Sequence, residues 1–235
     1  MQDVKKSSLT FAPEAGSQRL RNVINKGLTE ENILNGSAEA FKGGWNRVKL
    51  YFMLGLPTET VEDMQGIAEL SEKVAEVYYD TVPKEQRHGK VQVTASTSFF
   101  VPKPFTPFQW VPMNNRDEFL GKAKIVNQEV KDQLNRKSIK YNWHEADVTV
   151  LEGILARGDR RLAPAILRAY EKGALYDAWG ENFKYSRWSE AFDEFHLDPA
   201  FYTERERSYE EILPWDFIRI GVTKKFLWKE WERAQ

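Results

Sequence analysis

The chain has 235 residues, 41% of them hydrophobic, which is enough for a substantial core in one large domain or two small ones. Its 34 basic and 35 acidic side chains nearly cancel, so no global field attracts nucleic acid or an anionic membrane. No apolar run approaches the roughly 20 residues of a membrane span, no secretory signal is evident, and no cysteine is present to form disulfides, so we expect a cytoplasmic protein.

Strands alternate with helices in the first part of the chain. Ser8–Ala12 is a short apolar strand, and Ser17 is placed to cap the helix that follows it. Val48–Leu54 is almost wholly apolar, which is typical of a parallel strand covered on both faces. Gly55 then supplies the turn into a helix that we expect from about residue 60 to residue 79.

The third predicted strand, Val91–Val101, alternates between two kinds of side chain. One face carries mainly apolar residues, and the other is mostly small and polar (Gln92, Thr94, Ser96, Ser98, Phe100). In a barrel one of these sets lines the interior, and the polar one is a plausible ligand surface. Prolines at positions 102, 104 and 107 end the strand, and a long amphipathic helix is expected over 115–137.

Consecutive strand–helix units predict parallel strands, which makes this an α/β chain with half a barrel or a small open sheet. Past residue 143 the signals are helical, with stretches near 147–157, 160–172, 180–196, 204–212 and 223–234. Six of the eight tryptophans lie from residue 143 onward, and residues 144–235 carry 14 basic and 18 acidic side chains. We therefore expect an α/β part over 1–140 and a helical, tryptophan-rich extension over 141–235.

The strand ends carry a resemblance to a known superfamily. Thr10–Ser17 (TFAPEAGS) and Leu50–Thr60 (LYFMLGLPTET) resemble two strand-to-helix turns of radical S-adenosylmethionine (SAM) enzymes. The resemblance implies that the first 140 residues are the last three βα units of a partial TIM-like barrel. Those enzymes hold a 4Fe–4S cluster on a CxxxCxxC loop upstream of both turns, and that motif is absent here.

The resemblance also implies roles for particular residues. Glu14, followed by the small-residue turn to Ser17, would reach the ribose or amino end of SAM, and Lys26 would pair with the SAM carboxylate. Gly55 matches the second glycine of a loose GxIxGxxE motif, and Glu59 lies one position later than its glutamate. The end of the third strand, including Ser98 and Phe100, sits where backbone groups commonly hold the adenine.

Later motifs narrow the resemblance to one branch of the superfamily. Pro102–Trp110 (PKPFTPFQW), Arg157–Leu162 (RGDRRL) and Leu213–Asp216 (LPWD) are similar to a branch that joins a cobalamin-binding-like N-terminal domain to the radical SAM core and a helical tail. The resemblance implies that the intact protein cleaves SAM reductively to a 5′-deoxyadenosyl radical. This chain would then supply part of the SAM pocket, bind no cofactor of its own and show no turnover without the upstream half.

Each of these residues also has a plain structural interpretation. Glu14 can sit exposed at a turn, Lys26 is an ordinary cation in the last turn of a helix, and Gly55 needs no ligand to form its turn. Asp159 can cap a helix while Arg160 or Arg161 binds an anionic substrate or phosphate. The three histidines are too scattered to predict a metal site.

Two other functions remain open. The tail can be a module that presents substrate or RNA, although its excess of acidic residues makes nucleic-acid binding unlikely. A self-contained barrel enzyme acting on a phosphorylated metabolite lacks a glycine-rich phosphate loop. Exposed parallel edges on a three-stranded sheet predict pairing with the missing N-terminal half or formation of a homodimer.

Overall fold

The computed structural model describes residues 7–87 and 89–235, which fall into two compact units. The first unit runs from the start of the described chain to Phe99, continues over Phe119–His144 and includes the last two residues. The second consists of Phe100–Glu118 and Glu145–Arg233. The second unit therefore includes residues 100–118, which lie within the range predicted for the α/β part.

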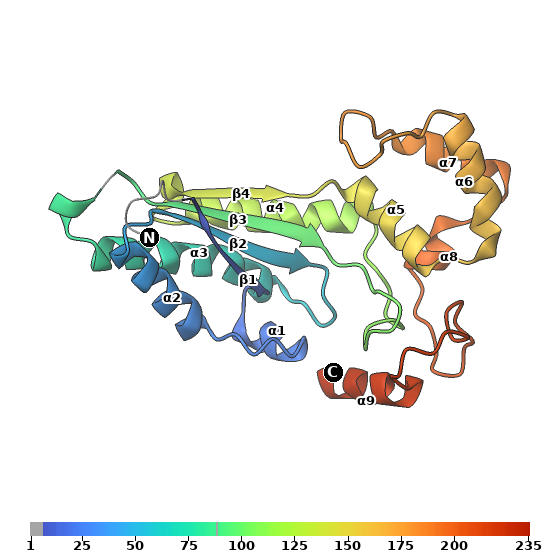
Figure 1. Ribbon diagram of the computed structural model, residues 1–235, viewed down its shortest axis with the longest axis horizontal. Coiled ribbons are helices and arrows are strands. Elements are labelled where there is room, and N and C mark those ends of the chain that lie inside the picture. Colours follow the sequence, from blue (N-terminus) through green and yellow to red (C-terminus); the bar gives the residue numbers. More distant parts are fainter. Residues whose placement is uncertain (1–6, 88) are drawn as a thin grey trace. The chain divides into compact units, whose positions relative to one another are not determined.

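The first unit is built on a parallel sheet whose spatial order follows the chain (Figure 1). Its strands are β1 (Leu9–Glu14), β2 (Arg47–Leu54), β3 (Gln92–Phe99) and β4 (Ile139–Trp143), paired in that order. The sheet is open, with β1 and β4 at its edges. The α/β class and the parallel strands are therefore confirmed, and the prediction of three strands is wrong because β4 is a fourth.

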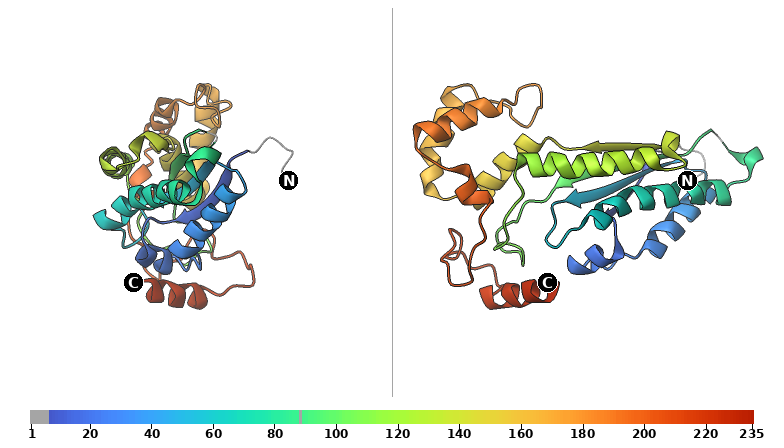
Figure 2. Two further views of the ribbon diagram at one scale, coloured as in Figure 1. Left: turned by 90° about the vertical axis from the view of Figure 1, so that its left-hand side faces the viewer. Right: turned by 180° about the vertical axis from the view of Figure 1, so that it is seen from behind.

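Helices cover one face of this sheet. Between the strands lie α1 (Gln18–Val23), α2 (Glu30–Lys42), α3 (Val61–Thr81), the short 3₁₀ turns η1 (Lys84–Gln86) and η2 (Arg136–Ser138), and α4 (Arg116–Asp132). Seen from behind, α2, α3 and α4 lie on the same side of the strands (Figure 2). Residues of the central strands on that side are buried, for example Leu50 of β2 and Ala95 of β3, both 0% exposed. Phe99 stacks on Phe119 of α4 with ring centroids 4.5 Å apart, and this contact holds α4 onto the sheet.

The opposite face of the sheet is polar and more exposed. Lys49 of β2 is exposed, Tyr51 is 40% exposed, and Thr94 and Ser96 of β3 are half-buried. The expectation that Val48–Leu54 is covered on both faces is therefore wrong. Alternation in β2 places only its even-numbered residues beneath the helices, and the apolar run concealed that pattern.

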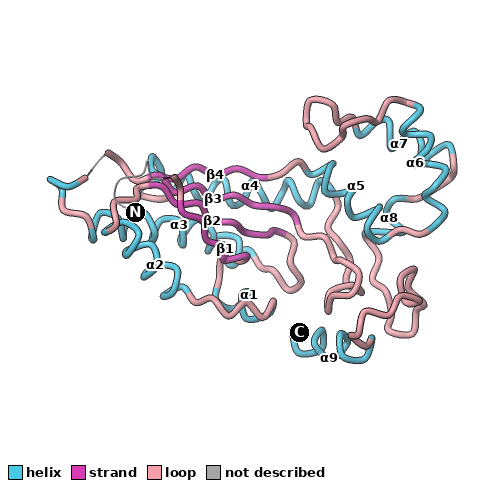
Figure 3. The backbone as a smooth tube through the Cα atoms, in the orientation of Figure 1, coloured by secondary structure: helices cyan, strands magenta, loops and turns pink. Residues whose placement is uncertain are grey.

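The second unit is helical, and hydrophobic clusters hold its described helices together. It contains α5 (Ala146–Arg157), η3 (Arg160–Leu162), α6 (Ala163–Glu171), α7 (Tyr185–Glu194), α8 (Pro199–Thr203) and all but the last residue of α9 (Lys224–Ala234). Figure 3 shows long irregular segments between these helices, and one of them replaces the helix expected over 204–212. Pro199 at the first turn and the Asp198 cap set the helix start earlier, and the helix ends at Thr203.

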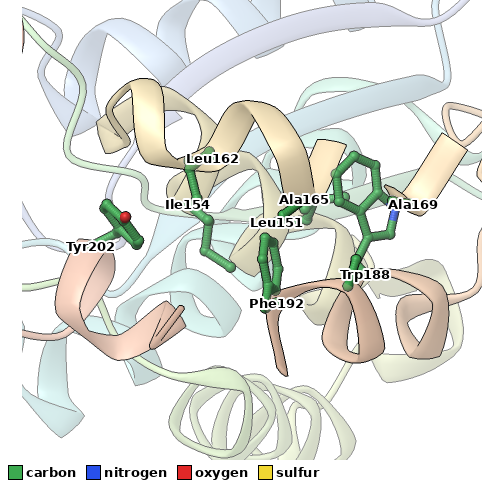
Figure 4. Close-up of a cluster of buried hydrophobic side chains, with 9 residues drawn as sticks. Leu151, Ile154, Leu162, Ala165, Ala169, Trp188, Phe192 and Tyr202 are labelled. Atoms are coloured by element: carbon green, nitrogen blue, oxygen red, sulfur yellow. The ribbon is translucent and has the colours of Figure 1, made fainter. Parts of the chain in front are cut away.

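The first cluster joins α5, α6 and α7 (Figure 4). Ile154 and Phe192 are 0% and 1% exposed, and Trp188 donates from Nε1 to Asp177 at 2.7 Å. The second cluster holds Trp110, Leu213, Trp215 and Leu227. Four of the tryptophans are therefore core residues, namely Trp110, Trp188, Trp215 and Trp231, whereas Trp143 and Trp179 are 40% and 62% exposed.

Candidate functional site

The predicted SAM-site residues of the first unit lie where β1, β2 and β3 end, at the carboxyl end of the sheet. Glu14 is the last residue of β1, Gly55 directly follows β2, and Ser98 lies one residue before the end of β3. The carboxyl ends of parallel strands lie together, and ligands of α/β proteins characteristically bind there. We therefore define the carboxyl ends of β1, β2 and β3, with the loops that follow them, as the candidate site.

Glu14 and Lys26 contact each other in the candidate site. The Lys26 ammonium lies 3.2 Å from Glu14 Oε1, and the side chains are 36% and 27% exposed. The Lys26 amide donates to the Arg21 carbonyl at 2.8 Å, which fixes the chain between the two partners. The sequence prediction joined these residues through the two ends of one ligand, and in the structure they form an ion pair with each other.

Glu14 and Thr58, in the candidate site, are non-glycine residues with left-handed backbones. Glu14 has φ of 68° and Thr58, in the loop after β2, has φ of 64°. This conformation costs a residue with a side chain roughly 1–2 kcal/mol. Arg19 helps to hold the second of them, since its guanidinium donates to the Thr58 carbonyl at 2.8 Å and to the hydroxyl at 3.2 Å. Such strained residues concentrate at functional sites.

Ser17 and Gly16 have structural roles. Ser17 caps α1 by accepting from the Leu20 amide at 3.1 Å, as expected, and its hydroxyl also donates to Asp63 in α3. A Cβ on Gly16 would lie 2.3 Å from the Asp63 carbonyl oxygen and 2.4 Å from the Ile67 amide. The β1 turn therefore packs backbone against backbone on α3, which only glycine permits.

Asp63 ties the two loops of the candidate site together. It accepts hydrogen bonds from Ser17, from Arg19, and from the Thr60 amide at 2.8 Å. Burial alone would raise the pKa of this carboxyl, but the hydrogen bonds from Arg19 and Ser17 outweigh it and lower the pKa. Asp63 therefore remains ionised and holds the turn after β1 against the start of α3.

Glu59 joins the turn at Gly55 to α4 through a hydrogen bond and an ion pair. Gly55 has φ of 87° and donates its amide to Glu59 Oε2 at 2.9 Å. The same oxygen accepts from Lys122 of α4 at 2.8 Å, and the Glu59 side chain is 2% exposed. Burial raises the pKa of Glu59, and Lys122 partly offsets that rise. Glu59 thus pairs with an internal partner and is turned away from solvent.

Ser98 and Phe100 lie in different units. The Ser98 hydroxyl donates to the Phe52 carbonyl at 3.4 Å, and nearby Ser96 donates to Asn142 Oδ1 at 2.7 Å on the same polar face. Phe100 belongs to the second unit, where it is 8% exposed and meets Phe108 edge-on at 5.7 Å. We assign Ser98 to the candidate site and Phe100 to the core of the second unit.

Arg160 and Arg161, both in the second unit, differ in their contacts. Arg161 forms an ion pair with Asp159 at 2.7 Å and lies over the ring of Phe201 at 5.1 Å. Arg160 is exposed in η3. Two further arginines, Arg157 and Arg207, are buried and line a pocket together with Arg161.

Several organising residues of the candidate site were missed for a common reason. Asp63, Lys122 and the wholly buried Arg21, which donates to the Ala15 carbonyl at 2.9 Å, act through contacts that depend on the fold. The only local signal was the Thr60–Asp63 spacing of a capping box.

Within residues 7–87 and 89–235, no cluster of three or more His, Cys, Asp or Glu side chains is arranged to hold a metal ion. No helix in those residues has the length and apolar character needed to cross a membrane.

Comparison with known proteins gives one relative to report. The chain is 33% identical over 193 residues to an uncharacterized protein of Methanocaldococcus jannaschii, a match that covers 78% of this chain. The chain spans about two fifths, 39%, of the length of that relative. No protein-family model matches the chain, and no solved structure matches it.

Proposed function

We propose that this chain forms the carboxyl-terminal part of a radical SAM partial barrel and supplies one side of the SAM pocket. The observation that carries the proposal is the singly wound sheet. Its strands follow the order β1-β2-β3-β4 without reversal, and α2, α3 and α4 lie on one face only (Figure 2). A doubly wound sheet reverses its strand order and carries helices on both faces, whereas a barrel keeps its helices outside.

The polar face fits the interior of such a barrel. Tyr51, Ser96, Ser98 and Asn142 lie on the side of the sheet opposite the helices and offer hydroxyl and amide groups to a ligand. In a closed or nearly closed barrel these side chains would line the lumen, with the candidate site at its carboxyl end. In the intact protein, further strands would pair with an open edge; a second copy of the chain is the alternative partner.

Glu14 and Lys26 fit the amino-acid end of SAM. A carboxylate accepts from an α-ammonium group, and an ammonium group donates to an α-carboxylate. The ion pair between them is partly exposed and of the kind worth about 0–1 kcal/mol, so separating the partners around a zwitterion costs little. The left-handed backbone at Glu14 sets the direction of this side chain before any ligand arrives.

The iron–sulfur cluster finds no ligands in this chain. Clusters of this kind are held by cysteine thiolates, and the chain has none, so the cysteines would come from elsewhere in the intact protein. When bound there, the cluster supplies the electron that cleaves SAM. The residues described above would orient SAM and shield it, and the substrate and outcome of the reaction are not part of the proposal.

The test uses the intact protein, purified without oxygen. A CxxxCxxC motif upstream, iron–sulfur absorbance, and release of 5′-deoxyadenosine from SAM with a reductant are the expected results. Lys26→Ala should weaken SAM binding by roughly tenfold or more, which corresponds to one charge-assisted contact. Lys42→Ala is the matched control, because Lys42 forms an exposed pair with Glu39 on α2. An intact protein without the cysteines, or equal SAM affinity in both variants, would refute the proposal.

A second candidate function is a module that presents substrate or RNA. It is favoured by exposed apolar side chains on α6 and in the loop after it, where Leu167 is 58%, Tyr170 59%, Tyr176 75% and Trp179 62% exposed. Aromatic side chains of this kind stack on bases. RNA binding by the chain that weakens steeply with salt would support this function, and no binding at low salt would exclude RNA.

A further inference from the structure

Two arginines are buried in the second unit without a carboxylate partner. Arg157, the last residue of α5, is 0% exposed, and Arg207, in the loop after α8, is 2% exposed. Neither forms an ion pair with any carboxylate of the described residues. Buried guanidinium groups are ordinarily paired, because an unpaired buried charge is costly.

Backbone carbonyls hold both side chains in place. Arg157 donates from Nε to the Tyr202 carbonyl at 2.9 Å and from Nη1 to the Pro102 carbonyl at 3.2 Å. Arg207 donates from Nη2 to the Arg157 and Tyr202 carbonyls, both at 3.2 Å, and its guanidinium lies 5.2 Å from the ring centre of Trp215. Both guanidinium groups are therefore fixed in direction by the fold.

The remaining N–H groups of these arginines require acceptors. Arg157 Nη2 and Arg207 Nε and Nη1 are buried and have no hydrogen-bond partner among the described residues. More than about 90% of buried polar groups in proteins are hydrogen-bonded, so three such donors on two adjacent cations are exceptional. Burial and the neighbouring Arg207 lower the pKa of Arg157 to about 9, and the group still stays charged at neutral pH.

Both arginines line a cavity of about 160 Å³. Its charged walls are Arg157, Asp159, Arg161, Arg205, Arg207 and Glu211, and the exposed Arg160 is not among them. One water molecule needs only about 10–15 Å³, so the cavity has room for an ion of several non-hydrogen atoms.

The cavity has a surplus of two positive charges. Its four guanidinium groups face two carboxylates, and both carboxylates are already engaged. Arg205 binds Glu211 through two hydrogen bonds, at 2.8 and 2.6 Å, and Arg161 binds Asp159 at 2.7 Å. A dianion would neutralise the surplus, whereas a single carboxylate would leave half of it.

We propose that this cavity binds a phosphate group, with Arg157 and Arg207 as its innermost donors. A phosphate monoester carries nearly two negative charges and three terminal oxygens, and guanidinium forks match that geometry. Arg161 and Arg205 have side chains 56% and 33% exposed, and they can move to admit the ion. The site lies wholly within the second unit and does not depend on SAM binding.

The test is calorimetric titration of the chain at constant ionic strength. The probes are inorganic phosphate, glycerol phosphate, succinate and chloride. We expect one phosphate per chain and a higher melting temperature in its presence. Binding of inorganic phosphate alone indicates a free-ion site, whereas binding of both phosphates indicates that the site takes the phosphate group of a larger molecule. Each of these results supports the proposal. Equal responses to succinate or chloride, or no response, would overturn it.

Variants separate binding from folding. Arg207→Lys keeps the charge but loses the fork, and it should weaken phosphate binding by roughly tenfold or more. Arg205→Gln is a second test at a more exposed position, in case Arg207→Lys does not fold. It should also weaken phosphate binding. Arg168→Gln is the control, because Arg168 pairs with Glu194 on the surface of the same unit. Phosphate affinity unchanged in Arg207→Lys and Arg205→Gln would refute the assignment.

Discussion

Replacing Lys122 with methionine tests whether Glu59 belongs to the interior of the protein or to a ligand. The substitution leaves the Glu59 carboxylate, 2% exposed, with the Gly55 amide as its remaining hydrogen-bond donor. Removing one partner of a buried ion pair costs about 3–5 kcal/mol. The Lys122 side chain is 20% exposed, so water can reach part of the site, and we expect a loss of about 2–3 kcal/mol at pH 7.

The loss should depend on pH. Burial raises the pKa of Glu59, and without Lys122 that pKa rises further. Between the ordinary pKa of a glutamate, about 4.3, and the raised native value, the folded state binds a proton that the unfolded state lacks. The free energy of unfolding therefore falls as pH rises through this window. The deficit of Lys122→Met relative to wild type should be smaller at pH 5 than at pH 8.

Thermal melts followed by circular dichroism at these two pH values measure the effect. A loss of 2–3 kcal/mol corresponds to a melting temperature lower by about 5–10 °C. Lys42→Met is the control and should cost under about 0.5 kcal/mol, since its pair with Glu39 is exposed. Glu59→Gln combined with Lys122→Met should recover most of the loss. Equal melting temperatures for Lys122→Met and Lys42→Met at both pH values would refute this reasoning.

Three further substitutions test the packing of each unit. Gly16→Ala should destabilise by about 1–3 kcal/mol or more, because its Cβ would meet the α3 backbone, whereas Gly27→Ala, with open space around it, should not; urea unfolding compares them. Asp63→Asn should cost about 1–2 kcal/mol at pH 7 through lost capping. Since the native pKa of Asp63 is lowered, that contribution is full above pH about 4 and is lost as pH falls through the native value, so acid titration of stability should show a weaker dependence in the variant. Phe192→Ala should cost about 3–5 kcal/mol by opening a cavity in the first cluster, and Phe217→Ala, at 82% exposure, should change the melting temperature little.

Apolar runs and alternation predicted β1, β2 and β3, but no such pattern predicted β4. Ile139 is the only buried residue of that strand, and Lys140 and Trp143 are exposed. An edge strand has one neighbour, so less of its surface is buried and little apolar pattern remains. The strand is stabilised by pairing with β3, as in the register of Ala95 with Tyr141, and that pairing is set by the fold.

In the candidate site, too, contacts between sequence neighbours could be predicted, whereas contacts between distant residues could not. Ser17 as a helix cap and Gly55 as a turn follow from neighbouring residues, and both predictions are confirmed. Glu59 lies 63 residues from Lys122, and Asp63 lies 44 residues from Arg19. No local pattern specifies such pairs, because they exist only after α3 and α4 have packed against the sheet.

The polar face of the sheet connects the fold with the proposed function. Parallel sheets are ordinarily covered on both faces. Here α2, α3 and α4 lie on one face (Figure 2), and Tyr51 on the other face is 40% exposed. A second layer of helices would require apolar side chains on this face. Ser96, Ser98 and Asn142 are instead small or polar, and they suit a lumen that holds a polar ligand or water. The composition of this face therefore supports the proposed partial barrel, because a doubly covered sheet would need apolar side chains here.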